Sequence, residues 1–143
     1  MAERAFFLMV LVDTSVWIDF FTGRRAAHVK KLEIMIADGE DICICGVVLT
    51  EILQGIRMDR EYRKIKEHLD ALIYLPVSRQ TFITAADMYR KMRKKGITIR
   101  RPVDCIIGAC AVEHDAGLLH NDRDFKHMEK HCGLGVIQKE GNT

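Results

Sequence analysis

The chain has 143 residues, with 22 basic and 20 acidic side chains, a formal net charge of +2 and 48% hydrophobic residues. These values predict one globular domain over residues 1–143 and exclude a disordered or low-complexity chain. Five cysteines with no C-x-x-C pair favour buried thiols in a reducing cytoplasm over a disulfide framework. The apolar run at 5–12 is shorter than the roughly 20 residues that span a bilayer, so we expect no membrane anchor.

Short apolar runs alternate with amphipathic segments along the whole chain. The runs predict strands at 5–12, 41–48, 74–77, 117–119 and 134–137. The segments with helical spacing predict helices at 14–21, 26–37, 49–56, 59–72, 79–95, 104–112 and 125–131. This alternation favours an α/β fold of three layers, α/β/α, in which helices cover both faces of a mostly parallel sheet of about five strands.

The first predicted strand ends at a carboxylate. Its apolar run leads directly into Asp13, and the hydroxyls of Thr14 and Ser15 follow. In open parallel sheets ligands bind beyond the carboxyl ends of the strands, so Asp13 lies where such a site is expected. Met9 is an alternative start, and in that case residues 1–8 are an extension that the fold does not need.

Three further acids share this context, since each follows a strand or stands at the entrance of a helix. They are Glu51, Asp104 and Asp122. The carboxyl ends of parallel strands meet at one edge of the sheet, so we expect the four acids to converge there. Crowded carboxylates stay ionised only with cations bound, and hard divalent ions such as Mg²⁺ take oxygen ligands. The pattern therefore predicts metal-assisted hydrolysis of a phosphodiester.

Other interpretations of single residues remain open. An acid at a strand end is more often a helix cap or turn former, and Asp124 is either a fifth member of the cluster or the cap of the last helix. The chain has no G-x-S-x-G, Gly-rich phosphate loop or H-E-x-x-H motif. His127, His131 and Cys132 have the spacing of a soft-metal site, but a solvated helix face is the favoured interpretation.

Three segments resemble the PIN-domain ribonucleases, and most closely the VapC toxins of prokaryotic toxin–antitoxin pairs. They read LVDTSVWIDFF at 11–21, VVLTEILQGI at 47–56 and RRPVDCIIGACAVEHDAGLLHNDRDF at 100–125. The resemblance covers essentially the whole chain. It implies a PIN fold, an endoribonuclease that uses Mg²⁺ or Mn²⁺, an RNA substrate, a homodimer, and inhibition by a cognate VapB-type antitoxin whose C-terminal segment enters the acidic groove.

The resemblance also implies roles for individual residues. Asp13, Asp104 and Asp122 would hold the metal, and Glu51 would hold a ligand or metal-bound water. The Thr14 hydroxyl would lie near metal or phosphate, and Asn121 would shape the loop that carries Asp122. His120 stands where small or hydroxylated residues are frequent in relatives, a departure that could alter the response to pH.

Basic residues precede the third acid. For the run at 90–95, a solvated helix end and an RNA contact remain equally open. Arg100 and Arg101 lie next to a predicted metal ligand, so we expect them to contact RNA phosphates. Trp17 and Phe125 could stack on bases, but packing in the core is the favoured role.

The function favoured by these residues is a metal-dependent endoribonuclease that acts as a toxin. Two alternatives are a PIN-fold subunit that binds RNA or protein without turnover, and a metal-dependent phosphatase on another α/β fold. Metal binding at the four acids would argue against the first, and small phosphate esters competing with RNA would indicate the second.

Overall fold

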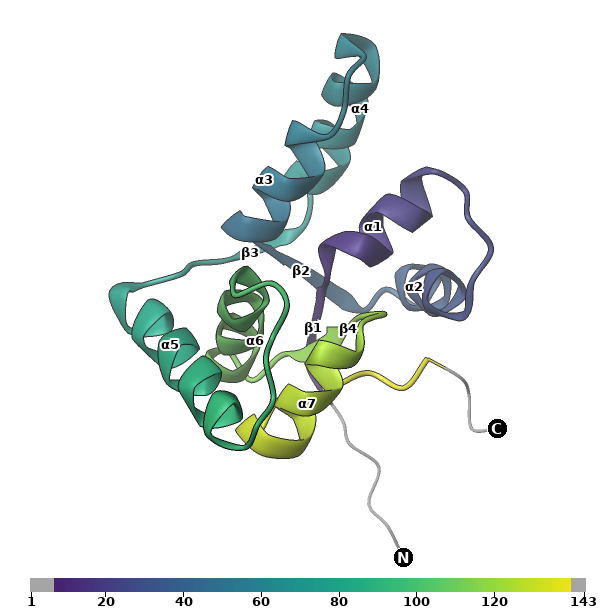
Figure 1. The fold of residues 1–143 in the computed structure, drawn as a ribbon. Coiled ribbons are helices and arrows are strands. Elements are labelled where there is room, and N and C mark those ends of the chain that lie inside the picture. Colours follow the sequence, from purple (N-terminus) through teal and green to yellow (C-terminus); the bar gives the residue numbers. More distant parts are fainter. Residues whose placement is uncertain (1–6, 140–143) are drawn as a thin grey trace, which may run out of the picture.

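The computed structural model describes residues 7–139, which form a parallel sheet between layers of helices (Figure 1). Its strands are β1 (Met9–Val12), β2 (Asp41–Cys45), β3 (Ile73–Leu75) and β4 (Gly117–Leu119), in the order β3-β2-β1-β4. The central strand β1 pairs with both neighbours, so Leu11 lies opposite Cys43 on one side and Leu118 on the other. The predicted α/β/α class is confirmed.

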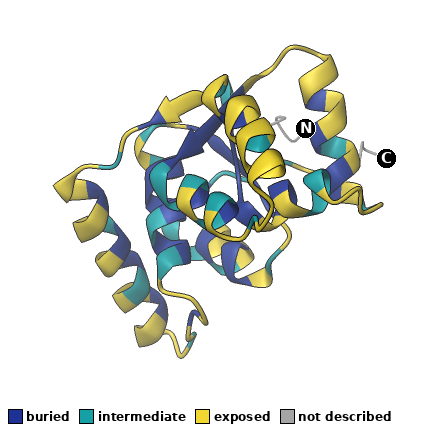
Figure 2. Ribbon diagram, turned by 90° about the horizontal axis from the view of Figure 1, so that it is seen from above, coloured by how far each residue is buried: buried dark blue, intermediate teal, exposed yellow. Residues whose placement is uncertain are grey.

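The strands are apolar because both faces of the sheet are covered. Leu11, Cys43 and Leu118 are fully buried, as expected for strands of a parallel sheet. Helices α5 and α6 lie on one side of the sheet, and α1 and α2 lie on the other (Figure 1). Figure 2 shows the resulting pattern, in which the inner strands are buried and the outer helices expose one face, while the edge strand β3 exposes Ile73 and Tyr74.

Seven helices occur in the described residues, each close to a predicted segment. They are α1 (Thr14–Phe21), α2 (Ala27–Ala37), α3 (Gly46–Gln54), α4 (Asp59–Asp70), α5 (Arg79–Lys94), α6 (Val103–Glu113) and α7 (Arg123–Cys132). Helix α6 is buried almost all round, as its sequence predicts, and it packs against both α5 and α7. Because α6 is held on several sides, the side chains at its start have a fixed position relative to the sheet.

Two predicted strands were partly wrong. The strand predicted at 41–48 ends at Cys45, and α3 already begins at Gly46, because apolar residues such as Val48 belong to a buried helix face. A buried helix and a buried strand cannot be told apart by a short apolar run alone. The strand predicted at 74–77 ends at Leu75, before Pro76, which has no N–H to donate.

The sheet has four strands in the described residues, whereas about five were predicted. The predicted strand at 134–137 does run parallel to β4, but only through one isolated bridge between Leu118 and Val136. Two backbone hydrogen bonds support it, from Leu118 N to Gly135 O and from Ile137 N to Leu118 O, both 2.9 Å long. This contact is too short to form a strand.

The first predicted strand was wrong at residues 7 and 8 as well, since β1 starts at Met9, and residues 5 and 6 lie outside the described residues. Phe7 lies over Gly117 and Gly135, where an added Cβ would come within 2.6 and 2.3 Å of its ring. The predicted dispensable extension falls mostly on residues 1–6, outside the described residues, and stays a prediction. Among residues 7–139 no helix is long and apolar enough to cross a membrane, and the five cysteines, which all lie there, are free thiols.

Candidate active site

The first residue of the site caps helix α1. Asp13 follows β1 in extended conformation, and its carboxylate accepts hydrogen bonds from the Ser15 backbone N–H (3.4 Å) and the Ser15 hydroxyl (2.8 Å). Its own backbone N–H donates to Leu119 O at 2.9 Å, which fixes Asp13 between β1 and β4. Asp13 is therefore a cap, as the structural alternative predicts, and it also stands at the carboxyl edge of the sheet.

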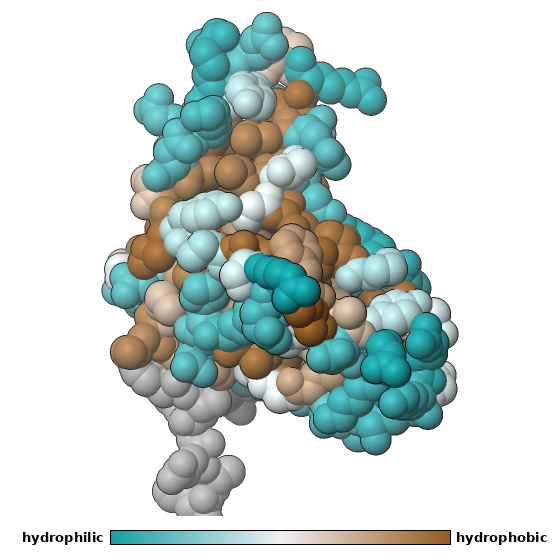
Figure 3. All heavy atoms as spheres, turned by 90° about the vertical axis from the view of Figure 1, so that its left-hand side faces the viewer, coloured by the Kyte–Doolittle hydropathy of each residue, from teal (hydrophilic) through white to brown (hydrophobic). Residues whose placement is uncertain are grey.

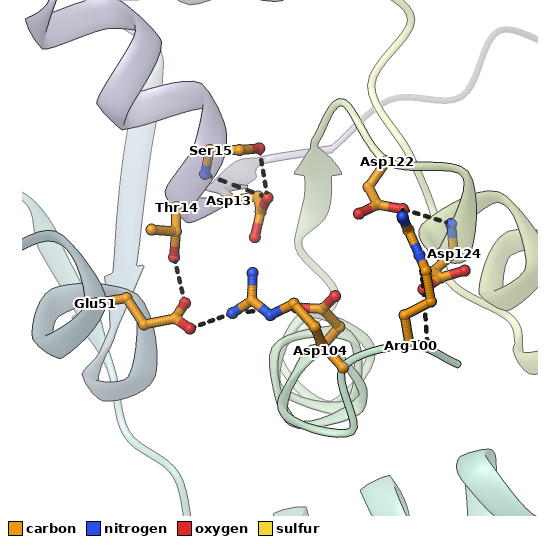
Figure 4. A network of polar contacts seen from close by, with 9 residues as sticks. Asp13, Thr14, Ser15, Glu51, Arg100, Asp104, Asp122 and Asp124 are labelled. Carbon is orange, nitrogen blue, oxygen red and sulfur yellow. Dashed lines mark hydrogen bonds and ion pairs between the residues drawn. The ribbon is translucent and has the colours of Figure 1, made fainter. Parts of the chain in front are cut away.

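Glu51 reaches the same edge from helix α3. Its Oε1 accepts a hydrogen bond of 2.7 Å from the Thr14 hydroxyl, and its Oε2 pairs with the Arg101 guanidinium. Glu51 lies off the apolar stripe of its helix, so its carboxylate faces the space beside Asp13 and Asp104 (Figure 4).

Three aspartates gather on the opposite side of that space. Asp104 is in the first turn of α6, Asp122 is the N-cap of α7, and Asp124 is in the first turn of α7. One carboxylate oxygen from each lies within 4.8 Å of the others. Among residues 7–139 this is the only group of His, Cys, Asp or Glu side chains with the spacing of a metal site, so His127, His131 and Cys132 do not form one.

Asp124 joins the cluster and is not the helix cap. Asp122 performs the capping, because its Oδ1 accepts from the Asp124 backbone N–H at 2.9 Å. The Asp124 carboxylate is buried and accepts from the Arg100 backbone N–H at 3.1 Å. Of the two roles that the sequence leaves open for Asp124, the structure favours membership of the acid cluster.

A histidine holds the Asp122 loop. The Asp122 backbone N–H donates to Nδ1 of His120 at 3.1 Å, and the His120 ring packs on Phe125 at 5.2 Å between centroids. Asn121, which was expected to shape this loop, is exposed and forms no hydrogen bond within residues 7–139 through its side chain. Burial lowers the pKa of His120 to about 4, so its ring is neutral and can accept the bond at neutral pH.

The two arginines lie within the acid centre. Nη2 of Arg100 is 2.7 Å from Oδ1 of Asp122, and its Nε is 3.4 Å from Oδ2 of Asp124. Arg101 pairs with Glu51 and lies 3.9 Å from Oδ1 of Asp104. The sequence predicts these side chains near the acids, but it does not predict direct pairing; the spacing of Arg101 and Asp104 at i, i+3 was the signal that could have indicated it.

Burial and neighbouring negative charges raise the pKa of two of the carboxylates. Burial raises the pKa of Asp13 above its ordinary value, and the charge of Glu51 adds to the rise. Burial also raises the pKa of Asp104 to about 7, opposed by the Arg101 charge and reinforced by Asp13, Asp122 and Glu51. The four predicted acids are therefore close enough to influence one another, as like charges that share a site do.

The aromatic candidates for base stacking are core residues. Trp17 and Phe125 are 3% and 1% exposed. The Trp17 ring stacks on Phe21 at 5.6 Å and meets Phe20 edge-on at 5.8 Å. The favoured prediction, packing in the core, is confirmed for both residues.

A separate groove of about 1320 Å³ lies outside the acid centre. It is formed mainly by apolar side chains of α1, α3 and α4, and none of the five clustered acids lines it. Thr14 and Glu51 belong to the same helices α1 and α3, so the groove and the acid centre share two of their walls. This groove is thus suited to an apolar partner, and the acid centre is suited to a cation.

In the described residues, a centre of carboxylates lies at the carboxyl edge of a four-stranded parallel sheet, and comparison with known proteins gives the family of the chain. The chain belongs to the PIN-domain family, whose profile, described as PIN domain, matches residues 10–131. Within that family it belongs with the VapC proteins. It is 35% identical over 120 residues to the VapC ribonuclease Mb1587 of Mycobacterium bovis, which covers 82% of this chain and 89% of that protein.

More distant relatives agree with this assignment. Ribonuclease VapC1 of Methanocaldococcus jannaschii is 27% identical over 132 residues, with 91% of this chain and 88% of that protein covered. The fold is similar to that of VapBC2 from Rickettsia felis, crystallised on a DNA fragment from its promoter, with a TM-score of 0.72, 19% identity, and coverage of 90% and 97%. It is also similar to Mycobacterium tuberculosis VapC20, titled a sarcin-ricin loop cleaving toxin, with a TM-score of 0.64, 15% identity, and coverage of 82% and 93%.

Proposed function

We propose that this protein is a VapC-type toxin, an endoribonuclease that hydrolyses RNA phosphodiester bonds with the help of a divalent cation. The observation that carries the proposal is the convergence of carboxylates from separate parts of the chain. Asp13, Glu51 and Asp104 come from three different elements, and Asp122 and Asp124 come from a fourth. Relatives that match most of the chain carry the name ribonuclease VapC.

The donor set fits Mg²⁺ or Mn²⁺. The group with metal-site spacing consists of the carboxylates of Asp104, Asp122 and Asp124, and such oxygen ligands suit hard cations. Asp104, Asp122 and Asp124 provide oxygens close enough for one ion, and Asp13 faces them across the centre (Figure 4). When bound, the cation supplies positive charge to the phosphate and lowers the pKa of the attacking water.

The side chains of the protein position the reacting groups and accept a proton. The Thr14 hydroxyl holds Glu51, so that the Glu51 carboxylate can orient the attacking water. Ser15 holds Asp13 toward the centre, and His120 holds the loop of Asp122. The Thr14 and Ser15 hydroxyls each donate to a carboxylate of the centre, and we assign both to holding these acids in place, with water as the group that attacks phosphorus.

The activity is tested by incubating the purified protein with defined RNA and with cellular RNA, in Mn²⁺ or in EDTA, and by sequencing the new RNA ends. We expect cleavage at defined positions in Mn²⁺ and intact RNA in EDTA. RNA that is bound but never cleaved would support a binding subunit without turnover. Hydrolysis of small phosphate esters that compete with RNA would support a phosphatase.

A VapB-type antitoxin is the partner that we propose for the apolar groove. Similar folds come from complexes titled VapBC and toxin-antitoxin. The groove exposes large apolar side chains to solvent, among them Ile18 and Ile36 at 45% and Met58 at 64%. An apolar segment of the antitoxin would cover them, and because the groove shares α1 and α3 with the acid centre, a continuing segment would reach the carboxylates.

This partner is tested by co-expression with the product of the neighbouring reading frame. We expect Met58→Glu to weaken the complex and to leave RNA cleavage unchanged, because Met58 lies outside the acid centre. The matched control is Arg63→Glu on the exposed helix α4, which changes charge outside the groove lining. An unchanged complex with Met58→Glu and Ile18→Glu together would contradict the proposed groove.

The homodimer stays a prediction. The side of the molecule that faces the viewer in Figure 3 exposes broad apolar areas between hydrophilic side chains. Large exposed apolar residues of β3 and α5 include Tyr74 at 55% and Phe82 at 52%. Light scattering of the purified chain gives its mass, and a Phe82→Glu variant that remains a dimer would indicate another interface.

A further inference from the structure

Two neighbouring arginines pair with different acids of the centre. Arg100 pairs with Asp122 at 2.7 Å and with Asp124 at 3.4 Å. Arg101 pairs with Glu51 and lies 3.9 Å from Asp104. The guanidinium of Arg101 is therefore the positive charge shared by Glu51 and Asp104, which come from different helices. A bound cation at these carboxylates would have to take over that role.

The partners of Arg101 differ sharply in exposure. The Asp104 side chain is 2% exposed and the Glu51 side chain 19%, whereas the Arg101 side chain is 52% exposed. The Asp104 carboxylate has very little contact with water, so it depends on a nearby positive charge when it is ionised. The Arg101 guanidinium can turn into solvent at little cost, because it is a long side chain already half in water.

The backbone of Arg101 is also held in place by a hydrogen bond. Its backbone carbonyl accepts the Asp104 backbone N–H at 2.9 Å, at the start of α6. Arg100 is bound more firmly, because both its backbone N–H and its guanidinium contact Asp124. Of the two arginines, Arg101 is the one whose backbone stays in place while its charged group is free to change partners.

We propose that Arg101 is an exchangeable counter-ion of the acid centre. It neutralises Glu51 and Asp104 in the cation-free protein, and it turns to a phosphate of the bound RNA once a divalent cation occupies these carboxylates. The inference rests on the proposed metal-dependent ribonuclease activity. It predicts two opposite effects of one side chain, since Arg101 weakens cation binding and strengthens RNA binding.

The first test is calorimetric titration of Mn²⁺ into the metal-free full chain. Arg101→Ala and Arg101→Gln remove the competing charge, and the second retains N–H donors for Glu51. We expect both variants to bind Mn²⁺ about three- to fivefold more tightly than the wild type, the size of one partly exposed ion pair. Arg63→Ala on α4 removes the same charge far from the described contacts and should leave affinity unchanged. Circular dichroism and thermal melting check that each variant is folded.

The second test measures RNA binding against salt, with Ca²⁺ as an oxygen-seeking ion and a gel to verify that the RNA stays intact. Loss of one phosphate contact reduces the slope of log affinity against log salt by about 0.7 for single strands. We expect this reduction for Arg101→Gln in Ca²⁺, and no reduction in EDTA, where the wild-type guanidinium is held by Glu51. Arg63→Ala should retain the wild-type slope in both conditions.

The outcomes separate the two proposals. If wild type and both Arg101 variants bind no Mn²⁺, the proposed metal-dependent function fails. If wild type binds Mn²⁺ and the Arg101 variants bind it equally or more weakly, the counter-ion role is overturned and the function stands. Tighter Mn²⁺ binding with an unchanged salt slope in Ca²⁺ overturns the exchange to phosphate.

Discussion

The Thr14 hydroxyl donates a hydrogen bond of 2.7 Å to Oε1 of Glu51, joining the first residue of α1 to the middle of α3 across 37 positions of the chain. Thr14 is buried, and Glu51 is also paired with Arg101. The carboxylate is therefore held from two directions, one neutral and one charged. Once Arg101 turns to a phosphate of bound RNA, as proposed above, the Thr14 hydroxyl alone sets the direction of the acid to which we assign the attacking water.

Thr14→Val should weaken catalysis more than it weakens the fold. The substitution keeps the shape of the side chain and removes one hydrogen bond, which costs about 0.5–1.5 kcal/mol of stability. We expect kcat on RNA to fall by about tenfold or more, since a misplaced catalytic group is costly, while Thr14→Ser retains most activity. Thr22→Val is the matched control, because its exposed hydroxyl bonds only within its own helix. Urea denaturation and steady-state kinetics provide the two measurements.

Asp13→Asn should abolish cleavage while leaving the fold intact. Asparagine caps helices as well as aspartate, so the hydrogen bonds with Ser15 can be kept. The variant also removes a buried charge that repels Glu51, and we expect its melting temperature without metal to equal or exceed that of the wild type. Asp13→Ala is the contrasting variant, since loss of the cap costs about 1 kcal/mol. Full activity of Asp13→Asn in Mn²⁺ or in EDTA would contradict the mechanism.

Stability in EDTA should fall from pH 4 to pH 7 through Asp104. Its pKa rises from 3.8 to about 7 on folding, so between these values the folded state binds more protons than the unfolded state. Stability from this group is then full below pH 4 and is lost as the pH rises to 7. The measurement that checks this is urea denaturation, which gives the difference in free energy of unfolding between wild type and Asp104→Asn at each pH. A difference that does not change with pH would refute the assignment, and Mn²⁺ at pH 7 should stabilise the wild type only.

The contribution of His120 to stability should change with pH in the opposite direction to that of Asp104, over nearly the same pH range. Burial lowers its pKa from 6.5 to about 4 on folding, so the unfolded state binds the extra proton. Stability from His120 is full above pH 6.5 and is lost as the pH falls to 4. His120→Asn cannot titrate and retains an acceptor for the Asp122 N–H. Its stability curve should therefore lack this loss. A wild-type curve alone would hide both effects, because they partly cancel.

The sequence was sufficient for the elements whose pattern has one physical explanation. Helix α6 is apolar on every side, and β4 is a short apolar run after a glycine; both lie where predicted. The errors occur where a pattern has two explanations. Val47 and Val48 are apolar and β-branched, which suits a strand, yet they lie in α3, where Val48 is buried and Val47 packs against the core. The chain past Leu134 reads as a strand but forms one bridge.

The candidate site was predictable in its acids and unpredictable in its pairings. A parallel sheet brings the ends of β1, β2 and β4 to one edge, so Asp13, Glu51 and Asp122 could be expected together. The choice between Asp122 and Asp124 as the cap, and the bond from Asp122 to His120, depend on backbone direction in one loop. The pairing of Arg101 with Glu51 joins residues 50 positions apart, and no local pattern contains that information.

The strand order β3-β2-β1-β4 has a consequence for synthesis of the protein. Strand β1 leaves the ribosome first but pairs on one side with β4, which is made more than a hundred residues later. Asp122 and Asp124 follow β4 directly, so a nascent chain that stops short of them has neither a complete sheet nor a complete set of acids. Domains fold as units. We therefore expect translation products that end before Asp122 to be inactive as nucleases.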